Sequence, residues 1–227
     1  MLYKKNQTSS LDPKLFQNPT SEYRGTPFWA WNCKVSKEDV DRTLNALKKM
    51  GMGGAHIHSR TGMDLPYLGK EFMEMVHYSH EKSNELGMIT WLYDEDRWPS
   101  GYAGGLVTKD PAFRQRFLVF SPEELPLHEE VKAEEGGSSA RAISSGKREF
   151  LARYAIRLEN GYLTKYHRLS AEAPVPEGFE TWYLYREISG DNAWFNDEAY
   201  VDTLNPRAMD KFIEITHEAY YRELGDS

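Results

Sequence analysis

The sequence predicts an α/β fold that carries a small antiparallel β region. Through the first hundred residues, short apolar segments alternate with amphipathic stretches of helical period, which is typical of βα units. Further along, Asn160 and Gly161 separate two strand-like segments, and this dipeptide favours a tight β-hairpin.

The first part of the chain predicts three strands joined by two helices. The first helix begins at Ser36, where Asp39 completes a capping box, and it ends at Gly51. The second helix spans residues 69–86. The strands lie at residues 27–32, 54–58 and 88–94. This order indicates a parallel sheet with right-handed crossovers.

The later part of the chain has a more polar composition and a strand-like pattern. An acidic stretch rich in Gly and Ser at residues 123–139 predicts an exposed loop, and antiparallel strands are expected at 150–158, 162–169 and 179–188. Residues 200–204 predict a further strand, followed by a helix that Asn205 caps. We therefore divide the chain into an N-terminal extension (1–24), βα units (25–120), an antiparallel insertion (121–190) and a final strand plus helix (191–227).

Composition excludes several classes of partner. The net charge of -7 and the absence of an unbroken Lys/Arg cluster argue against nucleic acid. No segment approaches 18 apolar residues, and no apolar stretch of a leader follows the first lysines, so we expect a soluble protein without a membrane partner, cytoplasmic as written. Because Cys33 is the single cysteine, no intrachain disulfide is expected.

Polar side chains gather where the predicted parallel strands end. His56, His58 and Arg60 share one face of the second strand by alternation. Asp94 and Glu95 follow the third strand. Because active sites of parallel βα folds lie at the carboxyl ends of the strands, the pattern predicts a pocket that holds a sugar through carboxylates and aromatic rings.

Other chemistries fit these residues less well. His56 and His58 have the spacing of a metal pair on a strand, but no third ligand is evident nearby, so we favour hydrogen bonding to hydroxyls. The glycines Gly101, Gly104 and Gly105 match neither nucleotide-binding fingerprint and are interpreted as turn residues. No metal site is assigned.

Five motifs occur in order along the chain. They are PFWAWN at 27–32, GAHIHSR at 54–60, WLYDE at 91–95, WPSGYAGG at 98–105, and LNP with THE at 204–206 and 216–218. Together they strongly resemble glycoside hydrolase family 106, the α-L-rhamnosidase family and its uncharacterised bacterial relatives. The resemblance covers residues 25–115 and 198–226.

The resemblance implies a (β/α)8 TIM-type barrel that hydrolyses terminal rhamnosyl or related bonds with inversion, and Ca²⁺ in the sugar site. Inversion needs two carboxyl groups about 6.5–9.5 Å apart. A whole barrel needs about 250 residues, and relatives continue into a strand with a Thr-Asp-Glu-Pro type motif. We therefore expect the N-terminal portion of a barrel with an inserted antiparallel β region, part of a larger enzyme, with little or no hydrolysis by these 227 residues alone.

The sequence hypothesis is a glycosidase with a carbohydrate substrate. Glu95 is predicted as the catalytic acid. Asp94 is grouped with it in the catalytic site as the carboxylate that binds hydroxyls or a cation, and the second acid/base carboxylate is expected beyond residue 227. The predicted sugar-binding residues are Trp31, Asn32, His56, His58, Arg60 and Trp98. Two alternatives stay open: a metal-dependent hydrolase that uses His56 and His58, and a non-catalytic carbohydrate-binding module whose stacking aromatics are Trp182, Tyr183, Tyr185, Trp194 and Phe195.

Overall fold

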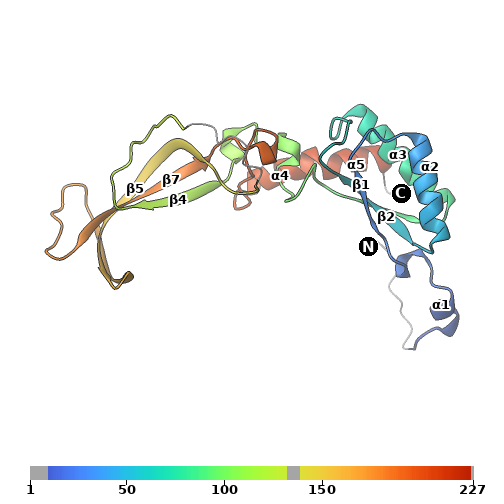
Figure 1. Ribbon diagram of the computed structural model, residues 1–227, viewed down its shortest axis with the longest axis horizontal. Coiled ribbons are helices and arrows are strands. Elements are labelled where there is room, and N and C mark those ends of the chain that lie inside the picture. Colours follow the sequence, from blue (N-terminus) through green and yellow to red (C-terminus); the bar gives the residue numbers. More distant parts are fainter. Residues whose placement is uncertain (1–9, 132–138, 226–227) are drawn as a thin grey trace. The chain divides into compact units, whose positions relative to one another are not determined.

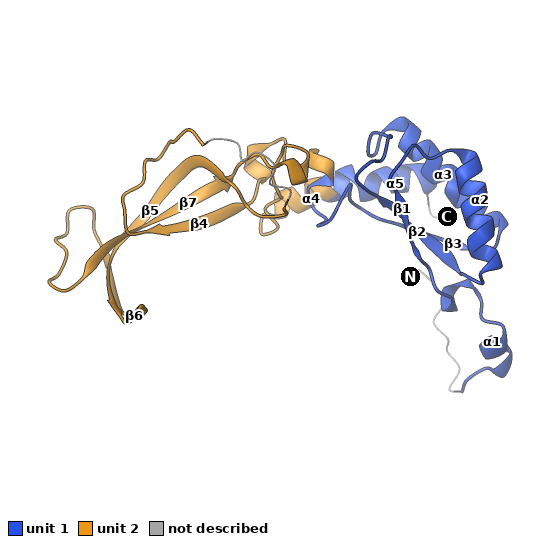
Figure 2. Ribbon diagram, viewed as in Figure 1, with its two compact units in different colours: residues 1–103, 213–227 blue, residues 104–212 orange. Residues whose placement is uncertain are grey.

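The computed structural model describes residues 10–131 and 139–225. The chain divides into two compact units, which Figure 2 shows in different colours. Unit 1 comprises residues 1–103 and 213–227, and unit 2 comprises residues 104–212. Residues 132–138 of the predicted polar loop lie outside the described residues.

Unit 1 is built on a parallel sheet in the order β1-β2-β3, whose strands are labelled in Figure 2. The strands are β1 (Phe28–Trp31), β2 (Gly54–Ser59) and β3 (Ile89–Leu92). Phe28 lies opposite His56, which in turn lies opposite Trp91. This register confirms the three predicted strands and their parallel order, although β3 ends earlier than expected.

The helices of unit 1 follow from local sequence signals. Helix α2 (Lys37–Lys49) begins at a complete capping box, in which the Ser36 hydroxyl accepts from Asp39 N and the Asp39 carboxylate accepts from Ser36 N. Helix α3 (Lys70–Glu85) ends before Gly87, whose φ of 62° lies in the left-handed region. Both predicted helices are confirmed.

One face of the parallel sheet carries the core of unit 1. Ala55 and Ile57 of β2 are buried against Val40 and Leu44 of α2 and against Phe72 of α3. Helix α5 (His217–Leu224) adds Tyr220 to the same cluster. The side chains on this face bury apolar area, which is the main contribution to the stability of the unit.

The other face of the sheet carries rings instead of aliphatic side chains. Phe28 is 56% exposed, while His56, His58, Trp91 and Tyr93 are partly exposed. The strand alternation that sends Ala55 and Ile57 into the core therefore places the two histidines on the opposite face. We call these five residues the ring face.

Unit 2 contains a curled antiparallel sheet in the order β4-β7-β5-β6 (Figure 1). Its strands are β4 (Arg116–Ser121), β5 (Ser144–Glu159), β6 (Tyr162–Leu169) and β7 (Glu180–Ser189). Asn160 and Gly161 join β5 to β6, both with positive φ, as a two-residue hairpin turn requires. The hairpin prediction is confirmed, whereas the sequence pattern does not predict β4.

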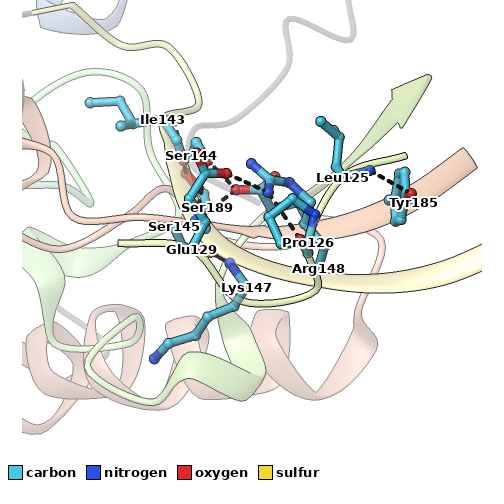
Figure 3. A network of polar contacts seen from close by, with 12 residues as sticks. Leu125, Pro126, Glu129, Ile143, Ser144, Ser145, Lys147, Arg148, Tyr185 and Ser189 are labelled. Atoms are coloured by element: carbon cyan, nitrogen blue, oxygen red, sulfur yellow. Dashed lines mark hydrogen bonds and ion pairs between the residues drawn. The ribbon is translucent and has the colours of Figure 1, made fainter. Parts of the chain in front are cut away.

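A buried ion pair stabilises unit 2 (Figure 3). Glu187 is 1% exposed, and its carboxylate accepts from Arg148 Nε at 3.0 Å and from Gly146 N at 3.0 Å, and also from the Ser144 hydroxyl. Arg148 reaches Glu129 as well, at 2.7 Å. Because all these partners satisfy Glu187, its burial costs far less than that of an isolated charge.

The remaining elements are short helical segments. Helix α4 (Pro206–Ile215) confirms the helix predicted after Asn205, whose side chain accepts from Arg207 N. The others are α1 (Pro13–Gln17) and the 3-10 turns η1 (Ser21–Tyr23), η2 (Ala103–Gly105), η3 (Pro111–Phe113) and η4 (Ala193–Phe195). Among the residues that the structure describes, no helix has the length and apolar character needed to cross a bilayer.

The chain is not a portion of a (β/α)8 barrel, so the predicted fold class is wrong, although the structure is mixed α and β. A barrel needs parallel strands that pair in succession until the sheet closes. Within the described residues, the parallel sheet holds three strands, and the following four form a separate antiparallel sheet. Residues 200–204, the expected continuation, do not join a parallel sheet. Their backbone bonds stay within unit 2, where Tyr200 O accepts from Gln115 N and Val201 bridges Arg114.

Candidate functional site

Except for Trp31, the predicted site residues of unit 1 lie on the ring face and on the segments that follow its strands. The imidazole of His58 stacks on the ring of Tyr93, with centroids 3.6 Å apart and planes 16° from parallel. His56 stacks on Trp91 at 5.4 Å and 9°. Phe28 lies beside His58 at 4.5 Å. The face is therefore a patch of neighbouring rings contributed by all three strands and the residue after β3.

His58 is held as a neutral ring. Its Nδ1 donates to the carbonyl oxygen of Ser59 at 2.7 Å, which leaves Nε2 as the acceptor nitrogen. Burial lowers the pKa of His58, and Arg60 and His56 lower it further, against the opposing effect of the Ser59 hydrogen bond. At neutral pH the site thus offers an uncharged imidazole that accepts a hydrogen bond.

Arg60 supplies positive charge beside the rings. Its guanidinium carbon lies 5.8 Å from the centroid of Phe28, within the range of a cation–π contact. The side chain is exposed. Arg60 can therefore donate hydrogen bonds to a ligand that lies on the ring face.

Asp94 is the partly exposed carboxylate of the site. Its Oδ1 accepts from the Ser100 hydroxyl at 2.7 Å, and its Oδ2 lies 3.7 Å from Nε2 of His217 in α5. The other ring nitrogen of His217 is 2.9 Å from the Thr216 hydroxyl. A chain of polar groups thus connects α5 to the loop after β3, and Asp94 retains 34% exposure.

Glu95 has a different environment from Asp94, although the two are adjacent. Its side chain is fully buried, at 0% exposure. Its Oε1 accepts from Asp96 N at 2.8 Å, and its Oε2 accepts from the main-chain N–H groups of Gly101, Tyr102 and Ala103 at 2.7–2.9 Å. Donors of this kind favour the charged form of a carboxylate. A proton on Oε2 would compete with three of these N–H donors.

Three tyrosines lie near the acidic segment, of which Tyr102 and Tyr220 are buried and Tyr67 is partly buried. Burial raises the pKa of Tyr67, Tyr102 and Tyr220, and the nearby carboxylates of Asp94, Glu95 or Asp96 raise it further. The Tyr220 hydroxyl donates to the carbonyl oxygen of Tyr93 at 3.0 Å. These phenols are therefore neutral hydroxyl groups throughout the physiological pH range.

Three other predicted sugar-binding residues lie in contrasting places. Trp31 is 0% exposed and packs edge-on against Phe72 in the core, on the opposite side of the sheet from the ring face. Asn32 is exposed directly after β1. Trp98 is 61% exposed in the loop after β3. The structure thus brings His56, His58 and Arg60 together and separates Trp31 from them.

The residues do not form the donor set of a metal site. His56 Nε2 lies 3.0 Å from the Thr26 hydroxyl, while the Nδ1 of His58 is engaged by Ser59 O. Within residues 10–131 and 139–225, no group of three or more His, Cys, Asp or Glu side chains is placed to hold a metal ion. Ca²⁺ takes about six to eight oxygen ligands, and we derive no step through it. The calcium hypothesis stays a prediction from the resemblance.

Two participants were not predicted from the sequence. Ser100 and His217 are the side chains that contact Asp94. Ser100 lies in the WPSG motif, which signals a turn but no partner. His217 follows 123 positions after Asp94 in the chain, and no local pattern in the sequence links the two residues. Only the docking of α5 places it beside the site.

Comparisons with known proteins give limited information. No protein-family model matches the sequence, and the search of curated proteins finds no match. Among solved structures, a rhamnosidase from Novosphingobium sp. PP1Y is 18% identical with a TM-score of 0.42, over 63% of this chain and 15% of that one. The chain thus spans less than a sixth of the length of that protein. A likeness at this level does not establish a shared family.

Proposed function

We propose that the ring face and the loop after β3 bind a carbohydrate, as in a protein of the glycoside hydrolase class. The stacked pair of His58 and Tyr93 beside Asp94 carries this proposal. Flat aromatic faces pack against the C–H faces of sugar rings, while carboxylate and guanidinium groups bind hydroxyls. Arg60, Asp94 and the Nε2 of His58 are suited to the second role.

The proposal assigns different tasks to the two adjacent acids. Asp94 is the carboxylate that contacts the ligand, because it is partly exposed. Glu95 is enclosed by four main-chain donors, so we assign it no proton transfer. An inverting reaction on a rhamnosyl or related bond would need a second carboxylate beside Asp94. We therefore propose that residues 1–227 alone bind sugar and hydrolyse it little or not at all.

Titration of the chain with sugars tests the proposal. L-rhamnose, methyl α-L-rhamnoside, L-fucose and D-galacturonate are added in turn while amide signals are followed by NMR. We expect one of them to shift signals of residues 56–60 and 93–100. His58→Ala and Asp94→Asn should each weaken binding about tenfold, from the loss of about 1.4 kcal/mol.

A matched histidine variant controls for general effects. His128 is exposed and belongs to unit 2, so His128→Ala should leave the affinity unchanged. Unchanged affinity in both site variants, or no spectral response to any of the four sugars, would refute the proposal. A rhamnosidase rate that Glu95→Gln abolishes would contradict the assignment of Glu95.

A second candidate is a carbohydrate-binding module based on unit 2. A hollow of about 280 Å³ on its curled sheet is lined by Phe120, Tyr154, Tyr166 and aliphatic side chains. The ring of Trp182 lies beside that of Phe120, with the two ring centroids 4.8 Å apart. Of the aromatics named from the sequence, Tyr185 and Phe195 are buried, which leaves Trp182, Tyr183 and Trp194 partly exposed. Loss of sugar binding in Trp182→Ala, with normal binding in His58→Ala, would favour this module.

A further inference from the structure

The loop after β3 is organised around a side chain that faces inward. Glu95 accepts from Asp96 N at the start of the loop and from three consecutive N–H groups, those of Gly101, Tyr102 and Ala103, at its end. Bonds to a charged acceptor are roughly twice as strong as those between neutral groups. One carboxylate therefore joins the two ends of this loop.

The backbone conformation at the end of the loop fits this arrangement. Ala103 has a φ of 51°, in the left-handed region that residues with a Cβ adopt at a cost. In that conformation its N–H lies 2.7 Å from Glu95 Oε2. This charge-assisted hydrogen bond offsets part of the cost of the left-handed conformation.

Ser100 lies within the joined segment and connects it to the ligand-facing acid. It directly precedes Gly101, whose N–H Glu95 accepts, and its hydroxyl donates to Asp94 Oδ1 at 2.7 Å. The position of the Ser100 hydroxyl thus depends on the position of the Gly101 amide. Ser100 thus lies between the amides that donate to Glu95 and the Asp94 carboxylate.

We infer that Glu95 is a positioning residue, which orients the Asp94 carboxylate by fixing Ser100 through the loop amides. This orienting role concerns the free chain, so it can be tested without a ligand. The consequence for sugar binding rests on the proposed function, and it is tested separately below.

The carboxyl ¹³C chemical shift of Asp94 reports directly on the Ser100 hydrogen bond. Asp94→Asn identifies the signal, and Ser100→Ala gives its position without the bond. We expect Glu95→Gln to displace the signal as Ser100→Ala does, and the double variant to displace it no further. Glu71→Gln, an exposed change in the first turn of α3, should leave it in place. A wild-type position in Glu95→Gln, or additive displacements, would overturn the inference.

If Glu95→Gln does not fold, hydrogen exchange in the wild-type chain tests whether Glu95 holds the amides of the loop. The amides of Gly101, Tyr102 and Ala103 lie outside the strands, yet we expect them to exchange at least about 100-fold more slowly than unstructured amides. The Asp96 amide should behave in the same way. Exchange of these amides at unstructured rates would show that Glu95 does not hold the loop.

Affinity for the sugar identified above tests the functional consequence. Glu95→Gln and Ser100→Ala should weaken binding by the same factor, about three- to tenfold, and the double variant by no more. Wild-type affinity in Glu95→Gln would contradict a positioning role in binding. If the wild-type chain binds no sugar, the proposed function fails, while the chemical shift and exchange measurements still test the role of Glu95.

Discussion

Trp31 and Trp98 show how one residue type serves two roles in this chain. Trp31 is fully buried among apolar side chains, whereas Trp98 is 61% exposed. We predict that Trp31→Ala lowers the free energy of unfolding by about 3–5 kcal/mol, because it leaves a large cavity. Trp98→Ala should change it by less than about 0.5 kcal/mol. Urea unfolding of the two variants measures both, and equal losses would contradict the packing described for Trp31.

The tyrosines near the acidic segment predict how unit 1 responds to high pH. The pKa values of Tyr67, Tyr102 and Tyr220 are raised in the fold, mainly by burial. Their contribution to stability is fully present below pH 10, near the ordinary tyrosine pKa, and is lost as the pH rises toward the folded values. Above pH 10 each should lower the free energy of unfolding by about 1.4 kcal/mol per pH unit.

Denaturation at several pH values measures this loss. Replacement of Tyr67 by Phe removes one ionisable group, so the decline above pH 10 should be less steep in that variant. Ultraviolet absorbance should show these phenolates forming only as the unit unfolds. A decline of the same slope in Tyr67→Phe would rule out its contribution.

At the scale of elements, helix α2 depends on its N-cap residue, Ser36. The Ser36 hydroxyl accepts from Asp39 N, and the capping box is complete. We predict that Ser36→Ala costs about 1 kcal/mol of stability. Thr20 is a suitable control, because it precedes η1 without a side-chain capping bond, so Thr20→Ala should be close to neutral. Thermal unfolding compares the two variants, and a neutral Ser36→Ala would mean that the cap contributes little.

At the scale of the molecule, unit 2 has a buried polar network of its own. Glu187 accepts from Ser144, Gly146 and Arg148, and these residues belong to unit 2. Arg148→Ala leaves this buried carboxylate without its cation, so we predict a loss of about 3–5 kcal/mol. In Arg148→Ala, amide hydrogen exchange in peptides from β5 and β7 should be faster than in the wild-type chain.

An exposed ion pair in the same sheet provides the comparison. Arg186 pairs with Glu149 across β7 and β5, and both side chains are about half exposed. Arg186→Ala should cost less than about 1 kcal/mol. If the two arginine variants were equally stable, burial would not be the property that makes the Arg148 pair important.

Local signals determined the elements of this protein. The capping box at Ser36, the alternation through GAHIH and the Asn160–Gly161 turn act over a few residues, so the sequence predicts α2, β2 and the hairpin correctly. Alternation also placed His56 and His58 on one face. Alternation does not predict the different surroundings of Asp94 and Glu95, because it applies within a strand and the chain turns directly after β3.

Only the tertiary structure decided how the sheets are assembled and what surrounds each acid. The backbone groups of residues 200–202 bond to 113–115, and the four antiparallel strands pair with each other, so no barrel portion forms. Glu95 is enclosed by amides six to eight positions later, and Asp94 receives His217 from α5. These contacts join residues far apart in the chain, and their free energy depends on packing that no local pattern encodes.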